Sequence, residues 1–236
     1  MILFGRRVSW AAVSVVLLGC GAAPPPAAVE VRSWGTMREV LREGRSEGRV
    51  APAAVTGAST IGVGALESLA GEVTILDGRA LVATAAAGDA RCAVRPAAPT
   101  ERAALLLVAD VPRWTGHAVG PCASYDDLER AIAALLTARG HDLTRPVPVR
   151  VRGRARELAL HVIAGACPVA TPDGPPPWRH RAPAAAVELV GVFVDGGAGR
   201  FTHHGRRSHL HAVAGAVMGH LDAVVLDDAV VSLPAP

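Results

Sequence analysis

Aromatic residues are scarce in this 236-residue sequence, in which Phe, Trp and Tyr together account for 3%. Hydrophobic residues still make up 50% of the chain, so a sizeable core is available, and it has to be built from Ala, Val and Leu. Blocks of like charge are also missing, because 24 basic residues are spread among 21 acidic ones. Scattered arginines without interleaved aromatics argue against nucleic-acid binding. The length suits one large domain or two small subdomains.

Cysteine is rare as well, and none of the four cysteines belongs to a C-x-x-C pair. If Cys20 is set aside, Cys92, Cys122 and Cys167 are left. One disulfide and one free thiol suit an oxidising compartment, and three buried structural thiols are the alternative. The pairing cannot be read from the sequence.

Long hydrophobic runs are absent except near the N-terminus, where residues 8–18 are apolar but too short to span a bilayer. Arg6 and Arg7 precede this run, and Leu17-Leu18-Gly19-Cys20 at its end resembles the bacterial lipobox. We therefore expect a lipoprotein-type signal peptide at 1–19, a lipid anchor on Cys20 and a Pro/Ala tether at 20–30. An ordinary secretory signal with an incidental cysteine is the alternative. Both place the protein outside the cytoplasm, and the first anchors it to the membrane.

Hydrophobic periodicity predicts two helices, at 33–47 and 125–139, with Ser124 as the N-cap of the second. The Asp77-Gly78 dipeptide predicts a hairpin turn, and the Pro-rich residues 170–183 are expected to form a surface loop. Apolar runs predict strands at 61–64, 72–76, 80–83, 103–109, 147–152, 158–163, 187–194, 207–213 and 218–226. Many strands with few βαβ alternations indicate an α+β fold of mixed or antiparallel sheets. We place the domain at 31–232, with two β-rich subdomains that meet near residue 150.

Three histidines near the C-terminus are candidate metal ligands. His209 and His211 are two residues apart in a predicted strand, so their side chains point to the same side. His220 follows after a glycine-containing connection, and a hairpin would bring it opposite the first two. Three imidazoles leave coordination positions open, as in a catalytic site, and suit zinc as well as iron, nickel or copper. His203 and His204 compete as ligands, and a surface hairpin that binds no metal is the alternative.

Motifs at the two ends of the domain together resemble the acetolactate decarboxylase family. Residues 62–78, G-V-G-A-L-E-S-L-A-G-E-V-T-I-L-D-G, are similar to the family pattern G-x-G-T-F-x-x-L-D-G-E followed by a D-G turn. Residues 36–44 are similar to the helix that opens the family's domain. S-H-L-H at 208–211 and G-H-L-D at 219–222 are similar to the family's H-L-H-F and G-G-H-V-L-D motifs. The resemblance covers about Val31 to Leu226.

This resemblance implies a zinc ion bound by His209, His211 and His220, and conversion of 2-acetolactate to acetoin and CO2. It also implies that Glu72 lies beside the metal and acts in positioning or proton transfer. Without the resemblance, we would expect Glu72 to be a surface acid near a turn that forms a salt bridge. The expected partner is a small 2-hydroxy-3-keto acid. A homodimer is left open.

The substrate-binding residues depart from the family pattern. Family members carry an arginine on a central strand that helps to hold the substrate carboxylate, and if that strand spans 153–162 here, His161 stands at the arginine's position. A packed strand histidine is the alternative reading of His161. The charge that holds the substrate is then weaker, pH-dependent or supplied by another residue, for which Arg156, Arg206 and Arg207 are the candidates nearby in sequence. We expect no counterpart of the family's C-terminal extension, which brings a further acid toward the metal, and Asp227 and Asp228 are the acids that follow Leu226.

These departures leave three hypotheses. The first is a metal-dependent decarboxylase that acts on 2-acetolactate or a similar acid. The second is an exported metal-binding lipoprotein of the same fold without decarboxylase activity, favoured if no guanidinium comes within contact range of the metal. The third is a structural or adhesive lipoprotein with a histidine-rich surface hairpin.

Overall fold

The computed structural model describes residues 29–86, 88–167, 171 and 173–235. The expected signal peptide, Cys20 and residues 20–28 of the expected tether lie outside this part of the chain. None of the described helices is long and apolar enough to cross a membrane. Cys92 is half-buried, Cys122 and Cys167 are buried, and all three are free thiols.

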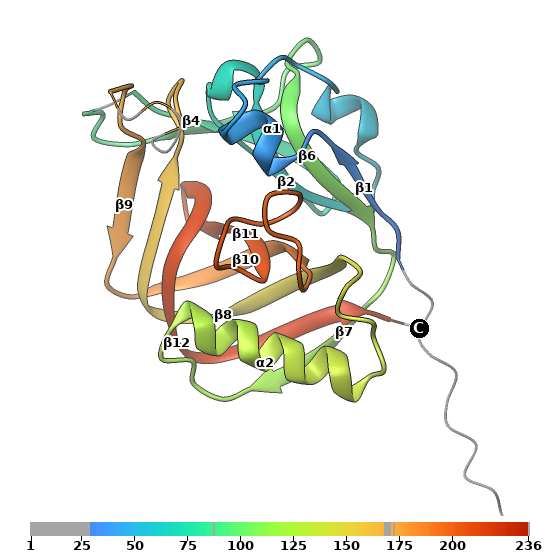
Figure 1. Cartoon of the computed structure of the whole chain (residues 1–236). Coiled ribbons are helices and arrows are strands. Elements are labelled where there is room, and N and C mark those ends of the chain that lie inside the picture. Colours follow the sequence, from blue (N-terminus) through green and yellow to red (C-terminus); the bar gives the residue numbers. More distant parts are fainter. Residues whose placement is uncertain (1–28, 87, 168–170, 172, 236) are drawn as a thin grey trace, which may run out of the picture.

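Two six-stranded antiparallel sheets and two α-helices make up the described fold (Figure 1), so the expected α+β class is confirmed. The elements in chain order are β1 (Val31–Trp34), α1 (Met37–Leu41), η1 (Pro52–Val55), β2 (Thr60–Leu66), η2 (Glu67–Leu69), β3 (Glu72–Leu76), β4 (Arg79–Thr84), β5 (Ala93–Pro96), β6 (Ala103–Asp110), β7 (Trp114–Val119), α2 (Tyr125–Ala138), β8 (Val147–Val162), β9 (Trp178–Ala182), β10 (Ala185–Phe193), β11 (Ser208–Ala214) and β12 (Val217–Pro234). The first sheet has the order β1-β6-β2-β3-β4-β5, and the second has the order β7-β12-β11-β10-β8-β9.

The second sheet closes on itself because β12 also pairs with β8. The long strands β8, β10, β11 and β12 thereby form a ring of hydrogen-bonded neighbours, as in a small barrel. Register shifts between Leu221 and Ala223 and again near Leu226 bend β12 along this path. The closure brings β8, β11 and β12 side by side at the place where the histidines lie.

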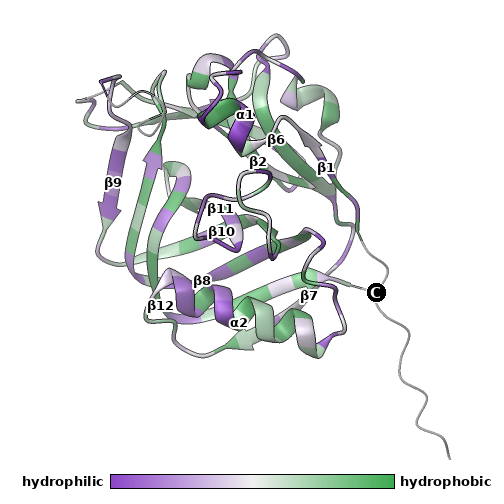
Figure 2. Ribbon diagram, in the orientation of Figure 1, coloured by the Kyte–Doolittle hydropathy of each residue, from purple (hydrophilic) through white to green (hydrophobic). Residues whose placement is uncertain are grey.

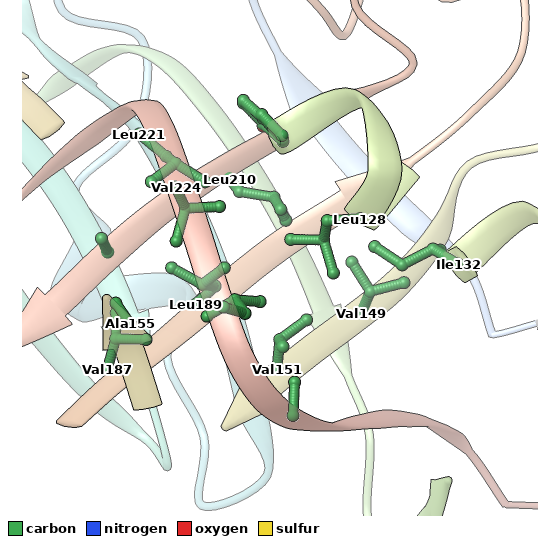
Figure 3. Close-up of a cluster of buried hydrophobic side chains, with 14 of the residues drawn as sticks. Leu128, Ile132, Val149, Val151, Ala155, Val187, Leu189, Leu210, Leu221 and Val224 are labelled. Carbon is green, nitrogen blue, oxygen red and sulfur yellow. The ribbon is translucent and has the colours of Figure 1, made fainter. Parts of the chain in front are cut away.

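Helix α2 covers the second sheet through one apolar face. Leu128, Ile132 and Leu136 are fully buried in the helix, and Figure 3 shows Leu128 and Ile132 against Val149. The exposed face of α2 carries charged residues in its first half, such as Asp126 and Arg130, and alanines and a threonine in its second half (Figure 2). The Ser124 side chain accepts a hydrogen bond from the backbone N–H of Asp127 at 3.1 Å. The predicted helix and its N-cap are therefore confirmed.

The predicted hairpin is also confirmed, as β3 and β4 joined at Asp77 and Gly78. These two residues have φ angles of 48° and 71°, which is the left-handed geometry of a tight hairpin turn. The Asp77 carboxylate reaches across to the second sheet, where it accepts two hydrogen bonds from the buried Arg150 at 2.7 and 2.8 Å. This ion pair lowers the pKa of Asp77, and it ties the turn to β8.

The predicted helix at 33–47 is wrong over most of its length. Residues 31–34 form β1, which pairs with β6, and the helix spans only Met37–Leu41. Gly35 has a φ of 70°, so the chain turns there. Thr36 then begins the helix with a capping box, in which Glu39 and Thr36 exchange side-chain-to-backbone hydrogen bonds of 2.9 and 3.1 Å.

Other boundaries also differ from the sequence predictions. The runs at 147–152 and 158–163 belong to one 16-residue strand, β8, and the predicted loop at 170–183 contains β9, which pairs with β8. Strands β1, β5 and β7 were not predicted. The chain passes between the sheets at residues 110–114, upstream of the expected boundary near residue 150. Val190 and Val192 of β10 pack with Ile61 and Val63 of β2 in one core cluster, so the subdomain division stays a prediction.

Candidate metal centre

The three predicted histidines meet on one face of the second sheet. His209 and His211 are two residues apart on β11, so both side chains point to the same face. His211 pairs directly with His220 across β11 and β12, because the turn at Gly215, with a φ of 60°, reverses the chain. One ligand nitrogen from each imidazole lies within 4.8 Å of the others. The sequence spacing therefore predicted this grouping correctly.

Hydrogen bonds fix the orientation of two of the rings. The Nδ1 of His209 lies 3.1 Å from the carbonyl oxygen of Phe201 and donates to it. The Nδ1 of His211 lies 2.8 Å from the hydroxyl of Thr74 on β3. We assign the proton of each ring to Nδ1, which leaves the lone pair of Nε2 for a ligand. Such outer hydrogen bonds orient metal-binding histidines.

The three imidazoles are neutral, which is the form that binds a metal ion. Burial, reinforced by His203, lowers the pKa of His209 to about 3. Burial and the neighbouring histidines hold the pKa of His211 and His220 well below the usual value. The Nε2 of His211 is buried without a hydrogen-bond partner in the described structure. An orphaned nitrogen among three neutral imidazoles fits a divalent metal such as zinc.

Glu72 approaches the histidines from the first sheet. It lies two residues before Thr74 on β3, so both side chains face the histidine cluster. Its Oε2 is 3.6 Å from the Nε2 of His211, and its Oε1 accepts a hydrogen bond from the backbone N–H of Ile163 at 3.3 Å. Burial is the main cause that raises the pKa of Glu72 to about 7, while His161 opposes this shift. Glu72 is therefore a buried carboxyl beside the candidate metal ligands and not a surface acid.

His161 extends the row of histidines onto β8. It pairs with His220 across β8 and β12, and the two ring centroids are 4.9 Å apart. The Nδ1 of His161 lies 2.7 Å from Oδ1 of Asp222, and the other carboxylate oxygen of Asp222 accepts a hydrogen bond from Arg179 at 3.0 Å. His161 is thus an oriented side chain at the site, not a packed core histidine.

A pocket leads from the surface to this cluster. Its inner part is a cavity of about 40 Å³ against Glu72, His161, His209 and His220. Its outer part is about 340 Å³. Met37, Leu41, His161, Ile163 and His203 line both parts. The two cavities therefore adjoin, and the smaller one lies against the histidine cluster.

The neighbouring histidines that competed as ligands have different positions. The ring of His203 lies edge-on to His220 with centroids 4.7 Å apart, and burial lowers its pKa to about 4. It lines the pocket but stands outside the group of three ligand atoms. His204 is exposed at the outer part of the pocket.

None of the three candidate replacement arginines lines the pocket. Arg156 pairs with Asp227 on the surface, with 2.9 Å between its Nε and the carboxylate. Arg206 lies over the ring of Tyr125, and Arg207 binds Asp195. Proximity in sequence to His161 or His209 did not bring these side chains to the pocket, because each guanidinium group meets another partner and none of the three lines either cavity.

Arg38, Arg42 and Arg179 instead line the outer pocket, and the sequence analysis missed them. Arg38 of α1 and Arg42, the C-cap residue of this helix, are four residues apart. This spacing places two side chains on one side of a helix, and it was a readable signal. Asp227 and Asp228 also lie away from the pocket linings. Asp222, two residues after the predicted His220, is the acid that meets His161.

A buried carboxylate also anchors the start of β11. Glu129 of α2 accepts hydrogen bonds from the backbone N–H groups of Arg207 and Ser208 at 3.0 and 2.9 Å, and from the Ser208 hydroxyl at 2.6 Å. Ser208 immediately precedes His209, so α2 helps to fix the strand that carries two of the histidines. The sequence analysis missed Glu129, although an acid on the buried face of α2, between Leu128 and Ile132, was a readable signal of a buried polar contact.

Comparison with known proteins finds relatives in structure only. No family model and no curated protein matches the sequence. The α-acetolactate decarboxylase of Bacillus subtilis strain 168 has a TM-score of 0.69 at 17% identity, over 86% of this chain and 84% of that chain. The acetolactate decarboxylase of Bacillus subtilis subspecies spizizenii gives 0.69 at 15% identity, over 86% and 85%.

A Staphylococcus aureus protein of unknown function, described as similar to α-acetolactate decarboxylase, gives a TM-score of 0.66 at 17% identity, over 86% of this chain and 84% of that chain. Identities this low concern the fold and not the activity. The motifs at the two ends of the domain had pointed to the same architecture, and the chain has the α-acetolactate decarboxylase fold.

Proposed function

We propose that this protein is a metal-dependent decarboxylase that converts 2-acetolactate, or a similar 2-hydroxy-3-keto acid, to acetoin and CO2. One observation carries the proposal. Three neutral histidines with a buried carboxyl beside them lie at the inner end of a pocket, in a chain with the α-acetolactate decarboxylase fold. His209, His211 and His220 would hold the metal ion. A bound divalent ion supplies a Lewis acid that withdraws electrons as the carboxylate leaves.

Glu72 is the group that we assign to proton transfer. Loss of CO2 leaves an electron pair on the carbon that carried the carboxylate, and a proton has to reach that carbon to give acetoin. The Oε1 of Glu72 is held by the backbone of Ile163, while Oε2 faces His211. A carboxyl group with one fixed oxygen and one oxygen at the reacting end is suited to general acid catalysis.

His161 and the apolar pocket walls position the substrate. Because the Nδ1 of His161 is bound to Asp222, its Nε2 remains for a hydrogen bond to a substrate oxygen. Met37, Leu41, Leu105 and Ile163 line the inner cavity. These apolar side chains exclude water from the reacting carbon, so that the proton comes from the protein.

The metal-binding lipoprotein without decarboxylase activity was the main alternative. It was favoured if no guanidinium came within contact range of the metal. No arginine among the described residues lines the inner cavity beside the histidines, whereas three arginines line the outer pocket. The acetoin assay distinguishes the two functions.

The direct test is to incubate the purified, zinc-loaded protein with racemic 2-acetolactate and measure acetoin. We expect acetoin to form with up to half of the racemate consumed, if one enantiomer is the substrate. Spontaneous decarboxylation is measured with the His211→Ala variant under the same conditions. If the wild type makes no more acetoin than this variant while zinc is bound, the proposed activity is wrong.

We also propose that the protein is exported and anchored by a lipid on Cys20. The proposal rests on the apolar run and the lipobox-like sequence that ends in Cys20. Cells grown with a radiolabelled fatty acid are expected to label the wild type but not a Cys20→Ser variant. Equal labelling of both, or labelling of neither, would contradict the anchor.

A further inference from the structure

Helix α1 places two arginines at the mouth of the pocket. Met37 and Leu41 of this helix line both the inner cavity and the outer pocket, whereas Arg38 and Arg42 line only the outer pocket. The helix thus offers apolar side chains near the histidines and cationic ones farther out. A ligand that reaches the histidines passes the guanidinium groups.

The backbone of Arg38 is held close to the loop that carries His203 and His204. Its N–H donates to the carbonyl oxygen of Gly199 at 2.8 Å, and the N–H of Met37 donates to that of Arg200 at 3.2 Å. A methyl group on Gly199 would lie 3.8 and 3.9 Å from two guanidinium nitrogens of Arg38, and 3.9 Å from the Nε2 of His204. The Arg38 guanidinium therefore lies against the pocket wall. Arg42 is one helical turn farther along.

The charge of Arg38 is uncompensated in the described structure. No acidic side chain lines the outer pocket, and no hydrogen bond or ion pair of the Arg38 side chain is found among the described residues. Arg42 likewise has no side-chain hydrogen bond or ion pair among the described residues, whereas Arg45 and Arg49 both pair with Glu39 at 3.2 and 3.3 Å. Arg179 in the same pocket is bound to Asp222. An unpaired guanidinium in an outer pocket that no acidic side chain lines is suited to bind an anion.

We propose that Arg38 binds the carboxylate of a small hydroxy acid whose other end reaches the three histidines. This inference rests on the proposed function and deepens it, because it assigns the carboxylate-binding charge to α1 and not to the strand that carries His161. A small inner cavity and a wider outer pocket suit a compact acid that points its carboxylate outward. The CO2 that leaves is then released on the open side of the pocket.

The test compares two unreactive probes that differ only in charge. One is the dihydroxy acid obtained by reducing the ketone of 2-acetolactate, and the other is its primary amide. Binding to the zinc-loaded protein is measured by calorimetry for the wild type and the Arg38→Gln variant. We expect Arg38→Gln to weaken binding of the acid about tenfold or more, which is the usual effect of losing a charge-assisted hydrogen bond. Binding of the amide should change less than threefold.

Two further variants make the test specific. Arg42→Gln removes the same charge one turn away and is expected to weaken acid binding less than threefold. Arg38→Lys keeps the positive charge but loses the planar guanidinium that can make two parallel hydrogen bonds, so its affinity for the acid should lie between those of the wild type and Arg38→Gln. If Arg38→Gln does not fold, Arg38→Lys takes its place in the comparison. The inference is overturned if the wild type binds neither probe, if acid and amide are affected equally, or if Arg42→Gln and not Arg38→Gln causes the loss.

The acetoin assay separates this inference from the proposed function. Binding of the acid that depends on Arg38, in a protein that forms no acetoin, would refute the decarboxylase and leave the carboxylate site standing. Acetoin formation by the wild type, together with unchanged acid binding in Arg38→Gln, would support the decarboxylase and refute the carboxylate site at Arg38. In an active enzyme, Arg38→Gln should raise KM for 2-acetolactate about tenfold with a smaller effect on kcat, as expected when a binding contact is lost.

Discussion

Replacing His211 with Ala is expected to weaken zinc binding by about 100-fold and to reduce acetoin formation to the spontaneous rate. His211 supplies the orphaned buried nitrogen of the cluster, and its ring is oriented by Thr74. Four-ligand zinc sites bind with about 10–16 kcal/mol, or about 3 kcal/mol for each ligand, which corresponds to about 100-fold in affinity. Zinc content after dialysis and competition with a chelator measure this loss.

The matched control is His180→Ala, which removes an imidazole from β9. His180 stacks on Trp178 with centroids 5.6 Å apart and lies outside the histidine cluster, so zinc binding should not change. His211 is fully buried, and its loss also leaves a cavity. The metal-free forms are therefore compared by thermal melting, and zinc is raised to restore binding in His211→Ala. If dialysed His211→Ala retains one zinc per chain with unchanged affinity, His211 is not a ligand.

The Glu72→Gln variant is expected to keep its zinc but to lose about 10²–10⁴-fold in kcat, the usual contribution of a general acid. Glutamine has nearly the same shape and can still accept the hydrogen bond from Ile163, so the fold should be kept. It cannot deliver a proton to the reacting carbon. Because the change affects a chemical step and not substrate binding, KM should vary little. Steady-state acetoin kinetics together with zinc analysis test both parts.

Glu67→Gln is the matched control for this substitution. Glu67 lies five residues upstream on η2 and its side chain is exposed, so its kinetics should match those of the wild type. A Glu72→Gln variant with kcat within threefold of the wild type would remove Glu72 from the chemistry. Loss of zinc in this variant would instead make Glu72 part of the metal site.

Local patterns predicted the elements whose causes are local. The hairpin at Asp77 and Gly78 formed because these residues adopt positive φ angles that the turn requires. Helix α2 began at its predicted cap because Ser124 and an apolar periodicity agree. The helix at 33–47 failed because β1 lies beside β6. That pairing joins residues more than 70 positions apart, which no window of the sequence reveals.

For the candidate site, the sequence by itself determined the three histidines and Glu72. The H-x-H spacing and the hairpin return are properties of neighbouring residues, since alternation along a strand fixes which side chains share a face. The motif around Glu72 added this carboxyl group to the three histidines of the candidate site. Proximity in sequence, however, selected the wrong arginines, because the partner that a long side chain meets depends on the fold.

The tertiary structure alone decided what surrounds these residues. The closure of the second sheet set His161 beside His220, and packing of the first sheet brought Thr74 to His211, 137 positions away. The placement of α1 on the pocket put Arg38 at its mouth. Such contacts depend on how two sheets and a helix pack as a whole, and that packing is determined by the burial of apolar surface from every part of the chain at once.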